Sequence, residues 1–113
     1  MSLDVSLTYE RPKTAYTSNI THNLTEMASQ VKLEKGLTLY DVLWRPDENN
    51  LYVAYQLIEL LDEGLTQLVD NPVLFREYAP ENGWGTYKGL VKFVAMYLVA
   101  CENNRDADVS VSR

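Results

Sequence analysis

Both ends of the chain alternate between apolar and polar residues. Residues 5–9 read Val-Ser-Leu-Thr-Tyr, and residues 107–112 read Ala-Asp-Val-Ser-Val-Ser. A period of two is typical of a β-strand that buries one face. We expect these two strands to pair into a two-stranded ribbon, because their apolar faces match and each needs a cover. A ribbon of two strands is only marginally stable in water, so helices must pack on it.

Between these strands, apolar residues recur at the three- and four-residue spacing of helices that bury one face. We predict a first helix that begins after a cap at Thr17 or Ser18 and ends before Gly36. Further helices are predicted over residues 37–44, 53–68, 72–78 and 86–103. The order predicts an α+β fold, in which four to five helices pack on the ribbon formed by the N- and C-terminal strands. The length of 113 residues predicts a single domain, residues 1–113.

The composition indicates a folded, water-soluble domain with an acidic surface. Hydrophobic residues make up 46% of the chain, and 16 acidic against 10 basic side chains leave a net charge of −6. This charge argues against general nucleic-acid binding, which needs a positive surface. No apolar run approaches the roughly 20 residues of a membrane span, and the first residues do not form a signal peptide. We therefore expect no membrane association and a cytoplasmic location, the host cell cytosol.

Residues that carry metal or covalent chemistry are scarce. Cys101 is the only cysteine and His22 the only histidine, which excludes an internal disulfide and a thiolate or histidine cluster for a metal. A phosphate-binding glycine motif is absent, and no carboxylate spacing selects an acid–base pair. We therefore expect no cofactor and favour a binding protein over an enzyme. A small hydrolase that acts through Glu26 and His22 remains an open alternative.

A first group of candidate binding residues lies at the start of the predicted first helix. Asn19, His22, Asn23 and Glu26 are three or four positions apart and would share one helix face. Asparagine and histidine are poor helix formers, whereas a solvated face usually carries Lys and Glu. Amide and imidazole groups at this spacing suit a polar ligand that several hydrogen bonds hold. The alternative is a solvated polar face without a ligand.

A second group is Trp44 followed by Arg45. A tryptophan ring can stack on a planar group, and an adjacent arginine can pair with an anion. The alternative is structural: Trp44 seals the core, and Arg45 binds the last carbonyl groups of the preceding helix.

A third group lies in the turn before the last helix, where residues 80–87 read Pro-Glu-Asn-Gly-Trp-Gly-Thr-Tyr. Asn82 and Gly83 are typical turn residues, because both tolerate positive φ. Two aromatic side chains in so short a turn need something to fill. Either Trp84 and Tyr87 plug the helix end into the core, or they line a binding site beside the free N–H groups of the helix start.

In combination, four segments resemble a family of short proteins encoded by phages and prophages. The segments are Asn19-Ile20-Thr21-His22-Asn23-Leu24, Leu43-Trp44-Arg45-Pro46-Asp47-Glu48, Pro80-Glu81-Asn82-Gly83-Trp84-Gly85-Thr86-Tyr87 and Asp106-Ala107-Asp108-Val109-Ser110-Val111-Ser112-Arg113. The resemblance spans nearly the whole chain. It implies a setting rather than a mechanism, because the family carries no settled activity. Small acidic phage proteins often act by occupying a host protein or a host defence signal.

We therefore expect a non-enzymatic binding protein that sequesters a small polar or anionic ligand, such as a nucleotide-derived host defence signal. Amide and imidazole groups would orient this ligand, aromatic rings would stack on it, and a guanidinium group would pair with its charge. The expected ligand-binding residues are Asn19, His22, Asn23, Trp44, Arg45, Asn82, Trp84 and Tyr87. The alternative is a protein–protein inhibitor that uses the same surface against a host factor. The aromatic content is also compatible with a homodimer.

Overall fold

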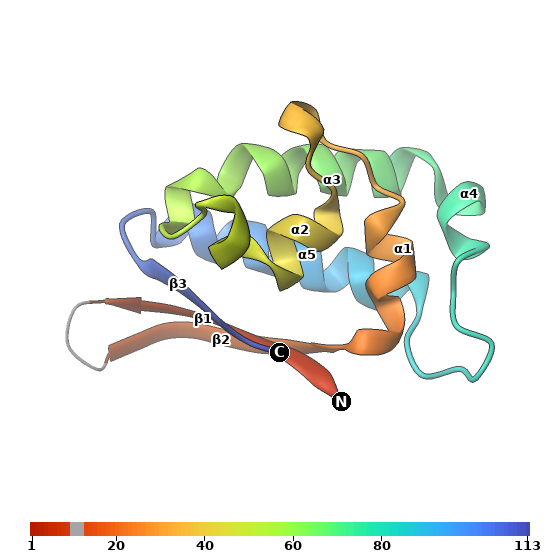
Figure 1. The fold of residues 1–113 in the computed structure, drawn as a ribbon, viewed down its shortest axis with the longest axis horizontal. Coiled ribbons are helices and arrows are strands. Elements are labelled where there is room, and N and C mark those ends of the chain that lie inside the picture. The colour runs from red at the N-terminus through yellow and green to blue at the C-terminus, as the bar shows by residue number, and fades with distance from the viewer. Residues whose placement is uncertain (10–12) are drawn as a thin grey trace.

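The computed structural model describes residues 1–9 and 13–113, and within them three strands form one antiparallel sheet. The strands are β1 (Ser2–Tyr9), β2 (Lys13–Thr21) and β3 (Asp108–Ser112), in the order β2-β1-β3. Helices cover one face of this sheet, and the two chain ends lie close together beside it (Figure 1). The α+β prediction is therefore confirmed.

The N- and C-terminal strands pair with each other, as the matching alternation predicted. Val5 lies opposite Val111 and Leu7 lies opposite Val109, with the apolar side chains turned toward the helices. The prediction of a two-stranded ribbon is wrong, however, because β2 adds a third strand on the other side of β1.

Strand β2 occupies residues that were predicted to cap and begin the first helix. In β2, Ile20 belongs to the face that packs under the helices, opposite Leu3 on β1. Ile20 also fits the helical spacing toward residue 24, so its position alone does not distinguish the two structures. The inward-facing Ser18 masks the strand alternation, although threonine-rich segments favour strands.

Five α-helices and four short 3₁₀ helices occur in the part of the chain that the structure describes. The α-helices are α1 (Thr25–Ser29), α2 (Leu39–Trp44), α3 (Ile58–Asp70), α4 (Pro72–Arg76) and α5 (Tyr87–Asn103). The 3₁₀ helices are η1 (His22–Leu24), η2 (Glu34–Gly36), η3 (Pro46–Asn49) and η4 (Ala54–Gln56). Local signals place several starts correctly, since Pro72 opens α4 and the Thr86 hydroxyl accepts a 2.9 Å hydrogen bond from the Gly89 N–H at the start of α5.

The core lies between the sheet and the two longest helices. Helix α5 lies over the sheet, and α3 packs on α5 from the side away from it (Figure 1). Leu3, Val5 and Leu7 of β1 are buried beneath α5, whereas the opposite face of the sheet carries small polar side chains. In the described residues, no helix is long and apolar enough to cross a membrane.

Two buried hydroxyl groups, those of Tyr16 and Tyr97, have no hydrogen-bond partner in the described residues. Tyr97 on α5 is fully buried and stacks on Tyr16 of β2 with ring centroids 6.1 Å apart, yet no group in the described residues accepts or donates a hydrogen bond at its hydroxyl. Burial also raises the pKa of this hydroxyl. A buried polar group without a partner costs about 1–3 kcal/mol.

Tyr97→Phe should therefore stabilise the protein, by about 1 kcal/mol or more, because it removes the unpaired hydroxyl and keeps the ring. Urea unfolding followed by circular dichroism measures the change in the free energy of unfolding. The control is Tyr87→Phe, which removes a hydroxyl that donates to the Leu68 carbonyl and should destabilise. Loss of stability in Tyr97→Phe would show that its hydroxyl has a partner.

Candidate functional site

The segments singled out in the sequence meet at one end of the sheet. Trp44 donates a 2.7 Å hydrogen bond from Nε1 to Nδ1 of His22, which joins the first segment to the second. The Trp44 carbonyl in turn accepts a 2.9 Å hydrogen bond from Arg113 in the last segment. A Cβ at Gly85 of the remaining segment would lie only 2.9 Å from Thr21, so that turn packs directly beside His22.

Trp44 is an internal support of this region rather than an exposed binding wall. It is 2% exposed, and its ring lies between Tyr40, stacked at 5.7 Å, and His22, tilted at 6.2 Å. Because the indole N–H occupies Nδ1 of His22, the neutral imidazole carries its proton on Nε2. The half-buried His22 is thus held in one tautomer, with a donor on the other side of its ring.

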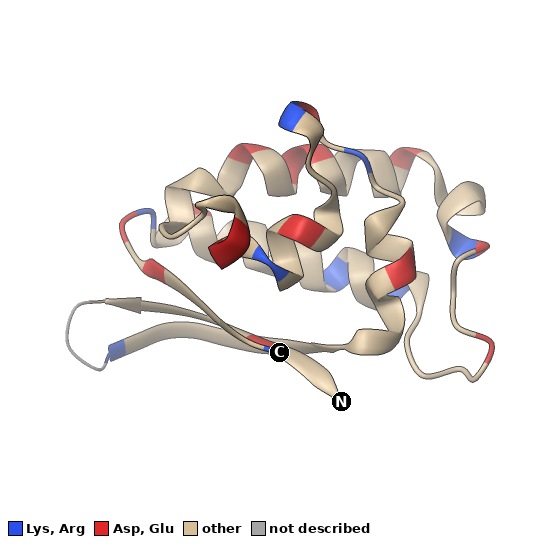
Figure 2. Ribbon diagram, viewed as in Figure 1, with Lys and Arg blue, Asp and Glu red and all other residues tan. Residues whose placement is uncertain are grey.

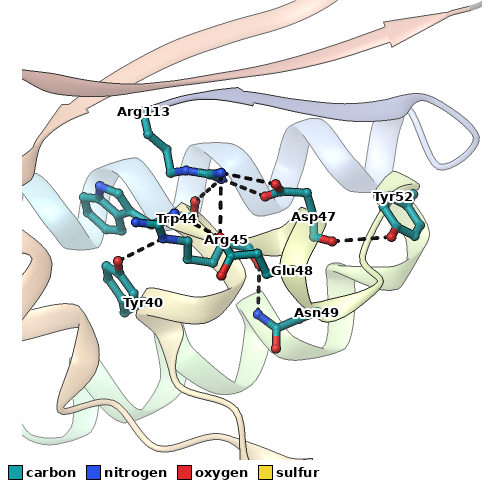
Figure 3. A network of polar contacts seen from close by, with 8 residues as sticks. All are labelled: Tyr40, Trp44, Arg45, Asp47, Glu48, Asn49, Tyr52 and Arg113. Atoms are coloured by element: carbon teal, nitrogen blue, oxygen red, sulfur yellow. Dashed lines mark hydrogen bonds and ion pairs between the residues drawn. The ribbon is translucent and has the colours of Figure 1, made fainter.

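Arg45 points into a network of polar side chains that lies between α2 and η3 (Figure 3). Its Nε donates to the Tyr40 hydroxyl at 3.2 Å, and its Nη1 pairs with the Glu48 carboxylate at 2.9 Å. The bond to Tyr40, and after it the bond to Glu48, raises the pKa of the Arg45 guanidinium. The positive charge proposed for an anionic ligand is therefore already engaged within the chain.

Arg113 completes the network and was not among the candidate residues (Figure 3). Its guanidinium holds the Asp47 carboxylate with two bonds, of 2.7 and 3.2 Å, while it also donates to the Trp44 carbonyl. The hydrogen bond from Arg113 lowers the pKa of Asp47. In the sequence, Arg113 is marked only by its place at the end of an alternating strand. Its position beside α2 depends on the pairing of β3 with β1, which the residues near Arg113 do not reveal.

Arg113→Gln should raise the pKa of Asp47 toward the ordinary value of about 3.9. Because the pKa of Asp47 is lowered in the folded state, the Arg113–Asp47 pair stabilises the protein at pH values above the ordinary aspartate pKa. This stabilisation is lost as the pH falls through the lowered pKa of Asp47. Carbon-detected NMR titration of the carboxyl group measures the change. Arg105→Gln is the control and should leave Asp47 unaffected; an unchanged Asp47 in both variants would contradict the assigned cause.

The turn before α5 separates its two aromatic residues. Tyr87 is buried, its hydroxyl donates to the Leu68 carbonyl, and the Arg76 guanidinium lies 5.0 Å from its ring centre. The Trp84 side chain is 72% exposed, although the backbone N–H of Trp84 donates a 2.9 Å hydrogen bond to the Asn82 side chain. Tyr87 thus plugs the helix end into the core, as one interpretation held, and Trp84 does not.

Asn19, His22 and Asn23 do not share one helix face as predicted, because Asn19 lies in β2 whereas His22 and Asn23 are adjacent residues of η1. Asn19 is exposed on the outer face of β2, and Asn23 is exposed in η1. The structure therefore brings together His22, Trp44 and Arg45, and it places Asn19 and the aromatic turn on neighbouring surfaces.

Two cavities adjoin these elements. An open pocket of about 420 Å³ between α1 and α2 is lined by Thr25, Glu26, Ser29 and Tyr40. A larger cleft of about 800 Å³ lies along α3, and its lining includes Glu59, Asp62 and Glu63 of that helix. Figure 2 shows acidic residues along this helix, whereas Lys and Arg positions occur on α5. Among residues 1–9 and 13–113, no three His, Cys, Asp or Glu side chains are placed to hold a metal ion together.

Comparison with protein-family models, with curated proteins and with solved structures found no match to this chain.

Proposed function

We propose that this chain is a non-catalytic binding protein that acts by occupying the surface of a protein partner, with Trp84 as the anchor of the contact. The observation that carries the proposal is a tryptophan, 72% exposed, on a turn that the fold holds in place. Tryptophan is enriched among the residues that dominate protein–protein binding energy. A large aromatic ring left in water therefore favours a partner surface that covers it.

The turn is pre-organised for such a contact. The Asn82 side chain accepts a hydrogen bond from the backbone N–H of Trp84. Gly85 packs against Thr21 and Leu24, and the Thr86 side chain caps α5. Ordering a flexible loop on binding costs free energy, which a fixed turn avoids. The fold thus supports presentation of the Trp84 ring in one orientation.

The ion pairs of Arg45 and Arg113 favour a protein partner over a small anion. Arg45 and Arg113 are paired with Glu48 and Asp47, so an anionic ligand would have to displace a carboxylate from each. Exposed ion pairs of this kind can instead form the polar rim of a protein interface. The resemblance to phage and prophage proteins supports a host factor as the partner.

Small-ligand capture is the second candidate, and the pocket between α1 and α2 favours it. Tyr40 supplies an aromatic wall, and Thr25 and Ser29 supply hydroxyl groups. His22 lies one helical turn before Thr25 and Glu26. Since Glu26 also lines the pocket, a neutral polar ligand suits it better than an anion.

Trp84→Ala tests the first candidate. Wild-type protein immobilised on a resin should retain a defined protein from a bacterial lysate, and Trp84→Ala should lose it while its melting temperature stays nearly unchanged. Val73→Ala is the matched control, because Val73 is similarly exposed, at 77%, but belongs to α4 rather than to the turn. Equal retention by all three proteins, or retention of nothing by the wild type, would exclude Trp84 as an anchor.

A thermal-shift screen with nucleosides and other neutral polar compounds tests the second candidate, with nucleotides and cyclic dinucleotides as the anionic comparison. A ligand at about 100 times its dissociation constant stabilises by roughly 2.7 kcal/mol, which raises the melting temperature by about 10 °C. Tyr40→Ala should abolish such a shift and Trp84→Ala should not. Analysis of the same mixtures for hydrolysed products tests the remaining alternative, a small hydrolase.

A further inference from the structure

We propose that the outer edge of β2 is a self-association surface, at which a second copy of this chain adds its own β2 antiparallel to the first. The two sheets would then continue into one sheet across a two-fold axis at Ser18. This inference uses other residues than the Trp84 contact and stands or falls independently of it.

The strand order leaves β2 with one open side. Just beyond the paired ends of β1 and β2, the His22 N–H donates to the Met1 carbonyl at 3.3 Å, and hydrogen-bonded pairs alternate with non-hydrogen-bonded pairs from there along the two strands. Ser18 and Ile20 therefore bond to β1, whereas the main-chain groups of Thr17 and Asn19 point away from it. No hydrogen bond to these outward groups is present in the part of the chain that the structure describes.

This edge lacks most of the devices that keep strands from pairing. It is nine residues long and carries one charged side chain, Lys13 at its far end. A register shift opposite Leu7 and Thr8 distorts that same end, so residues 16–21 form the regular part. Natural proteins protect long edges with charges, prolines or a covering segment, and an unprotected regular edge is a template for another strand.

An apolar groove lies between α5 and the Ala15–Tyr16 part of the edge, and it extends the surface onto α5. The groove measures about 470 Å³, and its walls include Tyr16 of β2 together with Met96 and Val99 of α5. Met96 is 51% exposed and Val99 is 53% exposed, although both are large apolar side chains. A chain that pairs with β2 would cover Met96 and Val99. One bound strand would therefore satisfy the outward main-chain groups of β2 and bury these apolar side chains.

The edge is complementary to itself, which favours a second copy as that occupant. With the axis at Ser18, Thr17 lies opposite Asn19 of the second copy, and their outward main-chain groups can exchange hydrogen bonds. Tyr16 would lie opposite the apolar Ile20 of the second copy. The two Lys13 residues would be about 30 Å apart, so no like charges face each other across the strands.

Cross-linking tests both the contact and its register. At the axis, two Ser18→Cys residues would sit at a non-hydrogen-bonded position with Cα atoms about 4.5 Å apart, which is within the range for a disulfide. Lys13→Cys is the matched control on the same strand and is too far from its counterpart. The native Cys101 is buried, which raises its pKa to about 12, so it does not compete.

Light scattering coupled to size-exclusion chromatography gives the oligomeric state. The wild type should be a dimer at about 100 μM, Val99→Lys should be a monomer, and Val73→Lys on α4 should remain a dimer. Mild oxidation should link most Ser18→Cys chains in pairs and few Lys13→Cys chains. A wild type that stays monomeric at this concentration overturns the proposal, as does a dimer that Val99→Lys leaves intact or that links through Lys13→Cys instead of Ser18→Cys.

Discussion

Replacing Trp44 with alanine should lower the melting temperature by roughly 12–20 °C, the largest loss expected from a single substitution in this chain. Trp44 is 2% exposed and stacks on Tyr40. Removing a buried tryptophan costs about 3–5 kcal/mol, since it leaves a cavity as well as losing apolar contact. The substitution also removes the hydrogen bond that fixes the tautomer of His22.

Thermal and urea unfolding of Trp44→Ala measure this cost. Trp84→Ala is a control of the same chemistry at an exposed position, where we expect a loss within about 0.5 kcal/mol. Trp44→Phe separates packing from the bond to His22, because it keeps an aromatic ring and loses the indole N–H. Similar losses in Trp44→Ala and Trp84→Ala would contradict the different burial of the two rings.

Gly85→Ala should destabilise the protein by about 2–4 kcal/mol, for two reasons that add. The backbone of Gly85 has φ of 120°, which L-residues rarely adopt. An added Cβ would also lie 2.9 Å from Thr21 Cγ2 and 3.0 Å from Leu24 Cγ. The substitution should therefore push the Trp84 turn away from η1 and weaken any binding that depends on that turn.

Gly83→Ala separates these two causes. Gly83 also has positive φ, 75°, but an added Cβ there meets nothing within 4 Å. Its expected cost is the backbone term alone, about 1–2 kcal/mol. Unfolding curves of both variants give the comparison, and an equal loss at the two positions would show that the close approach of Gly85 to Thr21 does not matter for stability.

The starts of α4 and α5 and the two terminal strands were predictable because their signals are local. Pro72 opens α4, Thr86 caps α5, and the alternation at both chain ends marks β1 and β3. Each of these signals acts within a few residues, through a fixed φ, a side chain that binds a nearby N–H, or a period of two. An α+β fold follows from their order along the chain.

The boundary between β2 and the first helix was not predictable from the same kind of signal. Ile20 satisfies both the strand alternation and the helical spacing, and Ser18 faces inward where an apolar residue would have marked a strand. The open edge of β1 decides between the two structures, because a third strand satisfies its main-chain groups. The helical face expected for Asn19 and His22 disappears as a result.

The sequence by itself determined the type of most elements and the α+β order, and it marked Trp44, Trp84 and Tyr87 as aromatic side chains that either pack in the core or line a site. Only the tertiary structure decided that Trp84 stays in water, that the Trp44 indole binds His22, and that Arg113 closes on Asp47. These contacts join residues far apart along the chain, and no local spacing encodes them. They follow from the register of β3 on β1 and from the packing of the turn against η1, which are properties of the assembled fold.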